Sequence, residues 1–480
     1  MRPLDLPLLP ILIALLLLLP TACQSAAVNP SGASSTKRPP ESTQAQPQAV
    51  PPSDPVGRKF EAWVAAINSV DRARIDGVWS GAKDAELRAS MDMAVAERTG
   101  GFELHRVEEA TAAEMVAVVR AKRTERWHCL QFHVDADPPH AIQTILLRPT
   151  SAPSDPENGS ALSAPFDNKA RGQVLQALVR ELNRAYVFPE KALAIERDLN
   201  ARQRQHAYDT LASRLAFGRT LTEELQRLTH DKHLHIEVGC SRGAARPGRE
   251  PSGPPAAGAD QPRVFGQARR LDGNVAYIDI ATFAVPGEKA RDEIRETMSA
   301  AADAAAIILD VRNNGGGEPE TVALVSSYLF GAEPVHLNSL YWRVSDRTDD
   351  FFTDPRVQGA KFGATKPVYV LTSGRTFSAA EEFTYNLQAR KRAVIVGETT
   401  GGGAHPGDLV PLPHGFTVFV PSGRAINPVT NTNWEGTGVK PDVPVPVETA
   451  LEAAHKLALE KGASGGSDAP RDGGAAEKKK

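Results

Sequence analysis

In the second half of the chain, short apolar runs rich in β-branched residues alternate with longer stretches whose apolar residues recur at helical spacing. The first pattern is typical of buried strands and the second of helices. Their alternation predicts a largely parallel α/β sheet over residues 262–460, with functional sites at the carboxyl ends of its strands. The expected strands are Val275–Ile280, Ala306–Val311 and Pro367–Leu371, and the expected helices are Glu288–Ala301 and Glu320–Leu329.

The first half of the chain divides into two smaller units. An apolar stripe from Phe60 to Ile67 predicts a helix, and three apolar or alternating runs follow it, so residues 57–150 are expected to form a small α+β domain. A Ser- and Pro-rich linker over residues 151–168 leads to a helical subdomain over residues 169–245. The subdomain has helical stripes at Leu175–Leu182 and Leu221–Leu228 and closes with a strand at Leu234–Val238.

The amino terminus has the pattern of an export signal. A basic residue precedes an apolar run from Leu6 to Leu19, which is too short for a membrane span but suits the core of a signal peptide over residues 1–23. The sequence ending at Cys23 resembles a bacterial lipoprotein cleavage box, which predicts lipidation of Cys23; ordinary cleavage near Ala26 or Ala27 is the alternative. Residues 24–56 are expected to be a flexible tether and residues 461–480 a disordered tail, so the protein would be exported to the cell envelope, in the periplasm, and lipid-anchored to a membrane.

Composition narrows the range of functions. The 480 residues have a formal net charge of −3, which gives no reason to expect a nucleic-acid partner. Cys129 and Cys240 are expected to be buried thiols, although an oxidising compartment would permit one bridge. Three neighbouring histidines near residue 233 have no carboxylate or cysteine at ligand spacing, so we expect neither a metal ion nor another cofactor.

Ser378 stands where the strand at Pro367–Leu371 gives way to a helical pattern. A hydroxyl there would lie at the first turn of a helix, whose free N–H groups favour an oxyanion. The alternative is that Ser378 only caps the helix, because Glu381 follows three residues later as in a capping box. A second loop, Asp310 to Gly317, contains three glycines and lacks the lysine of a phosphate-binding loop.

Five motifs together give the chain a family resemblance. They are L-T-x-D-K-H-L, D-V-R-N-N-G-G-G, T-S-x-x-T-F-S-A-A-E-E-F, R-A-V-I-V-G-E-T-T-G-G-G-A-H and N-W-E-G-T-G-V-x-P-D-V, in this order. Over about residues 169–460 the chain resembles the serine peptidases that include the C-terminal processing proteases and tricorn, in the branch of interphotoreceptor retinoid-binding protein. The resemblance implies a crotonase-like (ClpP/crotonase) α/β core with a helical subdomain. The small α+β domain, with a helix followed by an antiparallel meander and the segment F-E-L-H-R-V-E-E-A-T before the sheet, resembles SnoaL-like, nuclear-transport-factor-like domains.

The resemblance also implies roles for individual residues. Ser378 matches the nucleophile, His233 the general base and Glu435 the supporting acid. Without the resemblance, a surface turn carboxylate would be an equally good interpretation of Glu435. The backbone N–H of Ala379, with one from Gly316 or Gly317, matches the oxyanion hole. The glycine stretch has no lysine, which rules out a serine–lysine dyad, and Lys232 replaces the serine that precedes the histidine in tricorn. His405 competes with His233 as the base; otherwise it lies with Lys232 at the rim or contacts substrate.

These residues predict an exported serine peptidase that cleaves peptides or unfolded protein segments through an acyl-enzyme. A histidine base makes the serine hydroxyl nucleophilic, and a carboxylate holds the imidazole. The alternatives are a carrier of an apolar ligand and an envelope interaction protein acting through residues 57–150.

Overall fold

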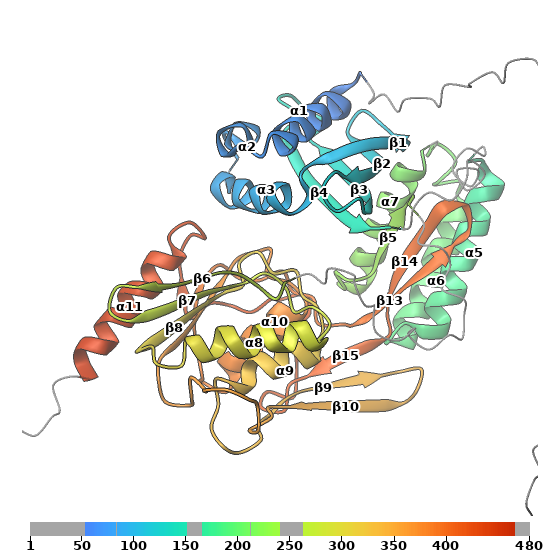
Figure 1. The fold of residues 1–480 in the computed structure, drawn as a ribbon. Helices are drawn as coiled ribbons and strands as arrows, with labels where there is room; N and C mark the ends of the chain where they lie inside the picture. The colour runs from blue at the N-terminus through green and yellow to red at the C-terminus, as the bar shows by residue number, and fades with distance from the viewer. Residues whose placement is uncertain (1–52, 83, 151–165, 212, 241–262, 466–480) are drawn as a thin grey trace, which may run out of the picture. The chain divides into compact units, whose positions relative to one another are not determined.

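The computed structural model describes residues 53–82, 84–150, 166–211, 213–240 and 263–465, which all belong to one compact unit. Its largest sheet has the strand order β16-β12-β11-β8-β7-β6 (Figure 1). All neighbours in it are parallel except β6 and β7. The strands are β6 (Phe265–Leu271), β7 (Val275–Ile280), β8 (Ala306–Asp310), β11 (Val368–Thr372), β12 (Val394–Gly397) and β16 (Val443–Pro444).

Both faces of this sheet are covered by helices, as expected for parallel strands that are apolar on both sides. On one face, side chains of β7, β8 and β11 share a core with α8 (Glu288–Ala300), α9 (Pro319–Ser327) and α10 (Ala379–Ala389). On the other face, Tyr277, Ile308 and Leu371 pack against alanines of α11 (Ala450–Gly465). The predicted largely parallel α/β arrangement is therefore confirmed, and each predicted strand and helix agrees with the structure to within about two residues.

A second unit combines helices with strands from a distant part of the chain. The helices α5 (Asn168–Ala185), α6 (Pro189–Arg204) and α7 (Arg214–Thr229) share one core with an antiparallel sheet of order β13-β14-β5. Strand β5 (His235–Val238) follows His233, whereas β13 (Gly407–Leu412) and β14 (Phe416–Pro421) follow the glycine loop at 401–403. The pairing of β5 with β14 therefore brings His233 close to this glycine loop, although the two are far apart in the sequence. A third sheet has the order β10-β9-β15, from β9 (His336–Trp342), β10 (Arg347–Phe352) and β15 (Gly423–Ile426).

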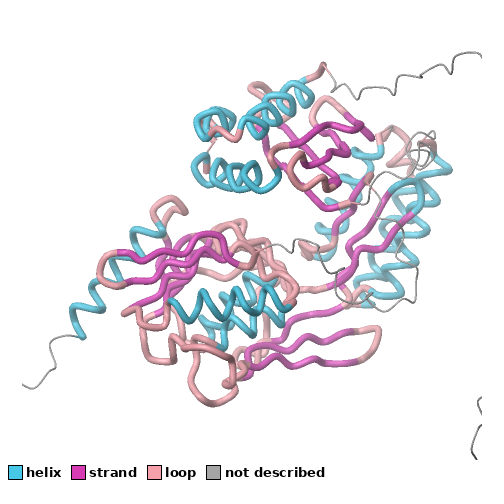
Figure 2. Tube along the Cα trace, viewed as in Figure 1, coloured by secondary structure: helices cyan, strands magenta, loops and turns pink. Residues whose placement is uncertain are grey.

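Residues 53–150 form the accessory domain, in which helices lie along an antiparallel sheet (Figure 2). Its core joins residues of all the helices to the sheet, and Asp92 accepts hydrogen bonds from the indole N–H groups of Trp63 and Trp79, each at 2.8 Å. The segment F-E-L-H-R-V-E-E-A-T, expected to precede the sheet, supplies its first strand. The elements are α1 (Pro55–Ser69), α2 (Arg72–Trp79), α3 (Ala85–Thr99), β1 (Phe102–Ala110), β2 (Glu114–Ala121), β3 (Trp127–Val134) and β4 (Ile142–Pro149).

The expectation of two buried thiols is wrong. Cys129 on β3 and Cys240 after β5 form a disulfide, with their Cα atoms 5.4 Å apart. Sequence distance gave no sign of it, because the pairing depends on how the accessory domain meets the helical unit. The bond closes a long loop and so restricts the unfolded chain.

The predicted signal peptide, Cys23, tether and carboxyl-terminal tail lie outside the described residues. Among the helices of the described ranges, none is both long and apolar enough to span a bilayer.

Candidate active site

Strand β11 leads into α10 through a turn at residues 373–378, and Ser378 is the N-cap of the helix. Its backbone has φ 56° and ψ −123°, a conformation that residues other than glycine seldom adopt. Such strain persists only where the surroundings hold it, and it is concentrated at functional sites. The half-buried Ser378 therefore lies at the first turn of a helix, where free N–H groups favour negative charge.

The glycine loop at 315–317 approaches this turn from β8. A Cβ at Gly316 would lie 2.8 Å from Ser378 Cβ and 3.2 Å from Ala379 N, so only glycine permits this approach of the two backbones. The Gly316 N–H donates to Asn314 Oδ1 at 2.8 Å, which holds the loop. A Cβ at Gly317 would collide with the backbone of Phe283. Gly316 and Ala379 thus lie together beside Ser378, with the Gly316 N–H engaged within its own loop.

Glu381 joins the Ser378 turn to a second glycine loop, residues 401–403. One carboxylate oxygen accepts from Ser378 N at 3.0 Å and Gly403 N at 2.8 Å. The other accepts from Thr400 Oγ1 at 2.5 Å and Gly402 N at 2.6 Å. Burial raises the pKa of this fully buried carboxyl, and the four donors oppose that shift. Glu381 therefore does more than the local capping expected of it, because it links the Ser378 turn to residues 400–403.

His233 lies against the residue that precedes Ser378. Its ring centroid is 4.6 Å from that of Phe377 and 5.5 Å from that of Phe419, and the side chain is buried. A Cβ at Gly403 would lie 2.6 Å from His233 Cε1, so the second glycine loop leaves space for the ring. Burial lowers the pKa of His233 to about 4, which keeps the imidazole neutral at neutral pH. Its buried Nδ1 has no hydrogen-bond partner in the part of the chain that the structure describes.

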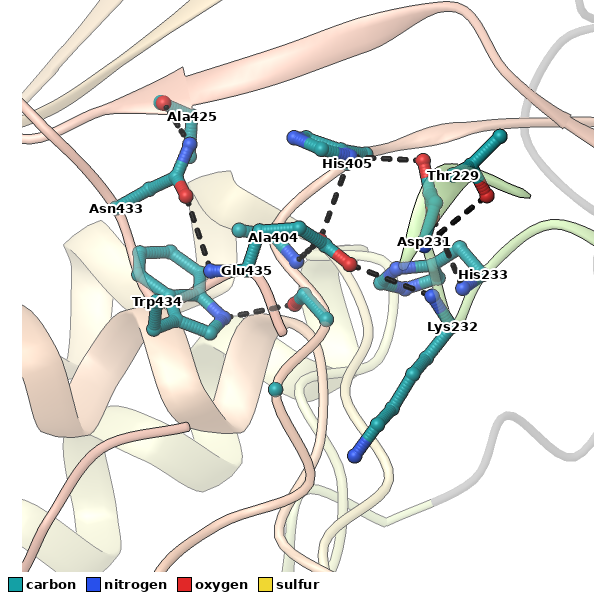
Figure 3. Close-up of polar contacts among 12 residues, drawn as sticks. Thr229, Asp231, Lys232, His233, Ala404, His405, Ala425, Asn433, Trp434 and Glu435 are labelled. Atoms are coloured by element: carbon teal, nitrogen blue, oxygen red, sulfur yellow. Dashed lines mark hydrogen bonds and ion pairs between the residues drawn. The ribbon is translucent and has the colours of Figure 1, made fainter. Parts of the chain in front are cut away.

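A buried cluster of Asp231, His405 and Glu435 lies next to His233 (Figure 3). His405 Nδ1 is 2.8 Å from Asp231 Oδ2 and 3.4 Å from Glu435 Oε2. Asp231 also accepts from the Tyr186 hydroxyl at 3.1 Å and, through Oδ1, from the His233 backbone N–H at 3.1 Å. Asp231 thus holds the backbone of His233 in place. Through its contact with Asp231, His405 connects that backbone to the loop after residue 403.

Glu435 contacts His405 and two backbone groups. Its carboxylate accepts from Ala404 N at 2.5 Å and Lys232 N at 3.3 Å. Burial and the neighbouring Asp231 charge raise the pKa of Glu435 to about 7. The Lys232 ammonium donates to Gly401 O at 2.5 Å while its side chain is exposed, which places it at the edge of the site.

Sequence reasoning did not single out Asp231 or Tyr186. Asp231 was visible as the acid inside L-T-x-D-K-H-L, but its burial and its three partners come only from the fold. Conversely, no hydrogen bond between Glu435 and the ring of His233, or between Ser378 Oγ and that ring, occurs among the interactions of the described residues.

The ligand-type atoms of Asp231, His405 and Glu435 lie within 4.8 Å of one another, close enough to hold a metal ion. Each is already engaged, however, because the two carboxylates share the His405 ring nitrogen and accept four further hydrogen bonds. The arrangement is that of a hydrogen-bonded polar cluster, and its polar atoms do not require a cation to be satisfied.

Two family profiles match the chain in succession. The profile of peptidase family S41 matches residues 274–445, and that of the N-terminal domain of peptidase S41 in eukaryotic IRBP matches residues 167–266. The carboxyl-terminal-processing peptidase 2, chloroplastic, of Arabidopsis thaliana is 31% identical over 175 residues. That match covers 36% of this chain and 32%, about a third, of the relative.

Two proteases are among the solved structures that resemble parts of the chain. The photosystem II D1 C-terminal processing protease is 18% identical, with a TM-score of 0.39, over 61% of this chain and 98% of that one. The tricorn protease is 11% identical, with a TM-score of 0.41, over 75% of this chain and 46% of that one. These scores indicate only partial agreement, so the family assignment rests on the sequence profiles.

Proposed function

Because the chain belongs to peptidase family S41, we propose that it is a serine peptidase in which Ser378 is acylated and His233 is the general base. The observation that carries the proposal is the approach of Gly316 to Ser378 and Ala379 at the N-terminus of α10, with the His233 ring packed on Phe377. These observations support the proposal because acyl transfer needs a nucleophile, a neutral base and donors for the oxyanion, and Ser378, the His233 ring and the N-terminus of α10 would supply them.

The reaction would proceed in two steps. His233 removes the proton from Ser378 Oγ, which attacks the carbonyl carbon of a peptide bond, and the Ala379 N–H and a glycine-loop N–H stabilise the oxyanion. The imidazolium then gives its proton to the leaving amine as the C–N bond breaks. Water, deprotonated by the same imidazole, hydrolyses the ester and restores the serine. Gly317 is the better loop candidate, because the Gly316 N–H already donates to Asn314.

His233 is preferred to His405 as the base because of what each ring contacts. Asp231 and Glu435 both lie at His405 Nδ1, and Phe188 packs edge-on to the ring with centroids 5.2 Å apart. A carboxylate at Nδ1 would also suit a catalytic base, so the preference rests on position. The His233 ring packs on Phe377, next to Ser378, whereas no contact of His405 with residues 377–379 occurs among the described residues. Glu435 would then support the site through His405 and through the backbone beside His233.

The finer expectations extend this proposal. The substrates are peptides or unfolded protein segments; the peptidase unit has a crotonase-like core, and the accessory domain is of the SnoaL-like class. The protein is exported and held at a membrane through Cys23. The Cys129–Cys240 disulfide supports export, because such bonds persist in oxidising compartments.

The test is digestion of a defined peptide pool by the full-length chain, with products identified by mass spectrometry. We expect internal cleavage by the parent and by Ser345→Ala, which changes an exposed turn serine, and no cleavage by Ser378→Ala. Cleavage by folded Ser378→Ala at the parental rate would rule out the proposal.

A further inference from the structure

Arg375 lies in the turn three residues before Ser378 and contacts two other segments of the chain. One terminal nitrogen of its guanidinium bonds the carboxylate of Asp84, the N-cap residue just before α3 of the accessory domain. The other donates to Asn313 Oδ1 at 3.0 Å, immediately before the loop that contains Gly316. A single side chain therefore joins the nucleophile turn, the first glycine loop and the accessory domain.

The Arg375–Asp84 pair is partly buried, with 30% of the arginine side chain and 22% of the aspartate side chain exposed. Among the described residues Arg375 Nε, which is buried, finds no hydrogen-bond partner, and burial lowers the pKa of the side chain while Asp84 opposes that shift. The carboxylate that bonds it is Asp84, which is itself held by Arg88 Nε at 2.7 Å. Removing Asp84 would take the bonded counter-ion from a partly desolvated cation and leave only the more remote charge of Glu398, which favours movement of the turn toward water.

The turn itself is linked to the glycine loop by a short chain of bonds. The Arg375 N–H donates to Ser373 Oγ at 3.1 Å, and Ser373 Oγ donates to Arg312 O at 2.5 Å. With the bond to Asn313, and with those from Thr376 Oγ1 to Val311 O at 2.8 Å and from Phe377 N to Asn314 O at 3.1 Å, four hydrogen bonds join the segment before Ser378 to residues 311–314. A shift of Arg375 would therefore change the spacing of Ser378 and the loop beside it.

The accessory domain also contacts the part of the chain that carries His233. Besides the disulfide at Cys240, Glu108 accepts from the Cys240 N–H at 2.5 Å. Glu109 accepts from the Arg214 N–H, at the start of α7, at 2.6 Å. Strand β5 runs from near His233 toward Cys240, so the domain contacts both the base-bearing and the nucleophile-bearing parts of the chain.

We propose that Arg375 is a positioning residue for Ser378 and that Asp84 holds it, so that the accessory domain sets the acylation rate. This inference rests on the proposed peptidase function. Because misplacement of a reacting group by about 1 Å can cost on the order of 100-fold in rate, loss of the contact should slow acylation roughly 10- to 100-fold. Substrate affinity should change little, because neither side chain has an assigned substrate contact.

The test uses full-length Asp84→Asn, Arg375→Gln, their double variant and Asp84→Glu. The matched control is Asp354→Asn, which breaks an exposed Asp–Arg pair with Arg356. Fluorophosphonate labelling rates and the kcat and KM for a peptide are measured, with thermal unfolding as the check on folding. We expect both single variants to lose acylation rate and kcat at unchanged KM, the double to be no worse than Arg375→Gln, and Asp84→Glu to recover part of the rate.

Hydrogen exchange of the peptide over residues 373–381 supplies a readout that needs no activity. Faster exchange in Asp84→Asn but not in Asp354→Asn supports the inference even if the parent protein is not labelled. Failure of the parent to label would count against the proposed function alone. Parental acylation by folded Asp84→Asn, additive losses in the double variant, or unchanged exchange would each overturn the inference.

Discussion

Replacing Glu381 by alanine should loosen the turn that presents Ser378. The carboxylate accepts from Ser378 N, Thr400 Oγ1, Gly402 N and Gly403 N within 3.0 Å. Alanine leaves all four donors without this acceptor in a buried place. The substitution thus affects the nucleophile turn and the second glycine loop at once.

The expected cost follows from these contacts. A hydrogen bond to a charged group contributes about 1.5–3 kcal/mol, and a buried donor left without its acceptor costs about 1–3 kcal/mol, but losses within one network do not add. We therefore expect Glu381→Ala to lower the free energy of unfolding by about 4 kcal/mol. Glu381→Gln keeps one carbonyl oxygen and two of the four bonds, so its loss should be about 2 kcal/mol.

Urea unfolding followed by circular dichroism measures these losses, and fluorophosphonate labelling of the still-folded protein reports on Ser378. The control is Glu452→Ala, which removes an exposed acid from the first turn of α11 and should change stability by less than about 1 kcal/mol. If Glu381→Ala unfolds like the control and labels at the parental rate, the account of Glu381 as a link is wrong.

Three further outcomes are expected. Acylation should fall only as pH drops through about 4, the lowered pKa of buried His233; a fall centred near pH 6.5 would contradict this. The lowered pKa of His233 also contributes to the free energy of unfolding. This contribution is complete above pH 6.5 and is lost as the pH falls from 6.5 to about 4, which the midpoints of urea unfolding would measure. In the accessory domain, Asp92→Ala should cost about 3 kcal/mol and shift tryptophan fluorescence, whereas Asp92→Asn should cost under about 1 kcal/mol because an amide oxygen still accepts both indole N–H groups. Replacing Cys129 and Cys240 by serine should lower stability by about 4 kcal/mol in urea titrations, since they close a loop with a sequence separation of 111, and reductant should mimic this in the parent.

Elements with a strong local pattern could be predicted from the sequence. Strand β7 and helix α8 were located almost to the residue, because a wholly buried strand is continuously apolar and an amphipathic helix repeats its apolar face. The Ser378 junction followed from the change between these two patterns. The position of His233 at the start of a strand could also be predicted. The residues that surround its ring could not.

What depends on distant pairing could not be predicted. Helix α3 lacks a strong apolar stripe, because its buried face contains Ala89, Asp92 and Ala96. The Cys129–Cys240 disulfide joins elements of two units. The role of Glu381 was hidden because its local capping pattern is common, while three of its four partners come from residues 400–403.

The most direct measurement of the central claim is covalent labelling of the full-length chain with a fluorophosphonate, followed by peptide mass mapping. We expect stoichiometric label on Ser378, no label in Ser378→Ala, and a rate lowered by roughly two to four orders of magnitude in His233→Ala, as for loss of a general base. A folded parent that stays unlabelled, or that spreads the label over several serines, would contradict the assignment of Ser378 as the nucleophile.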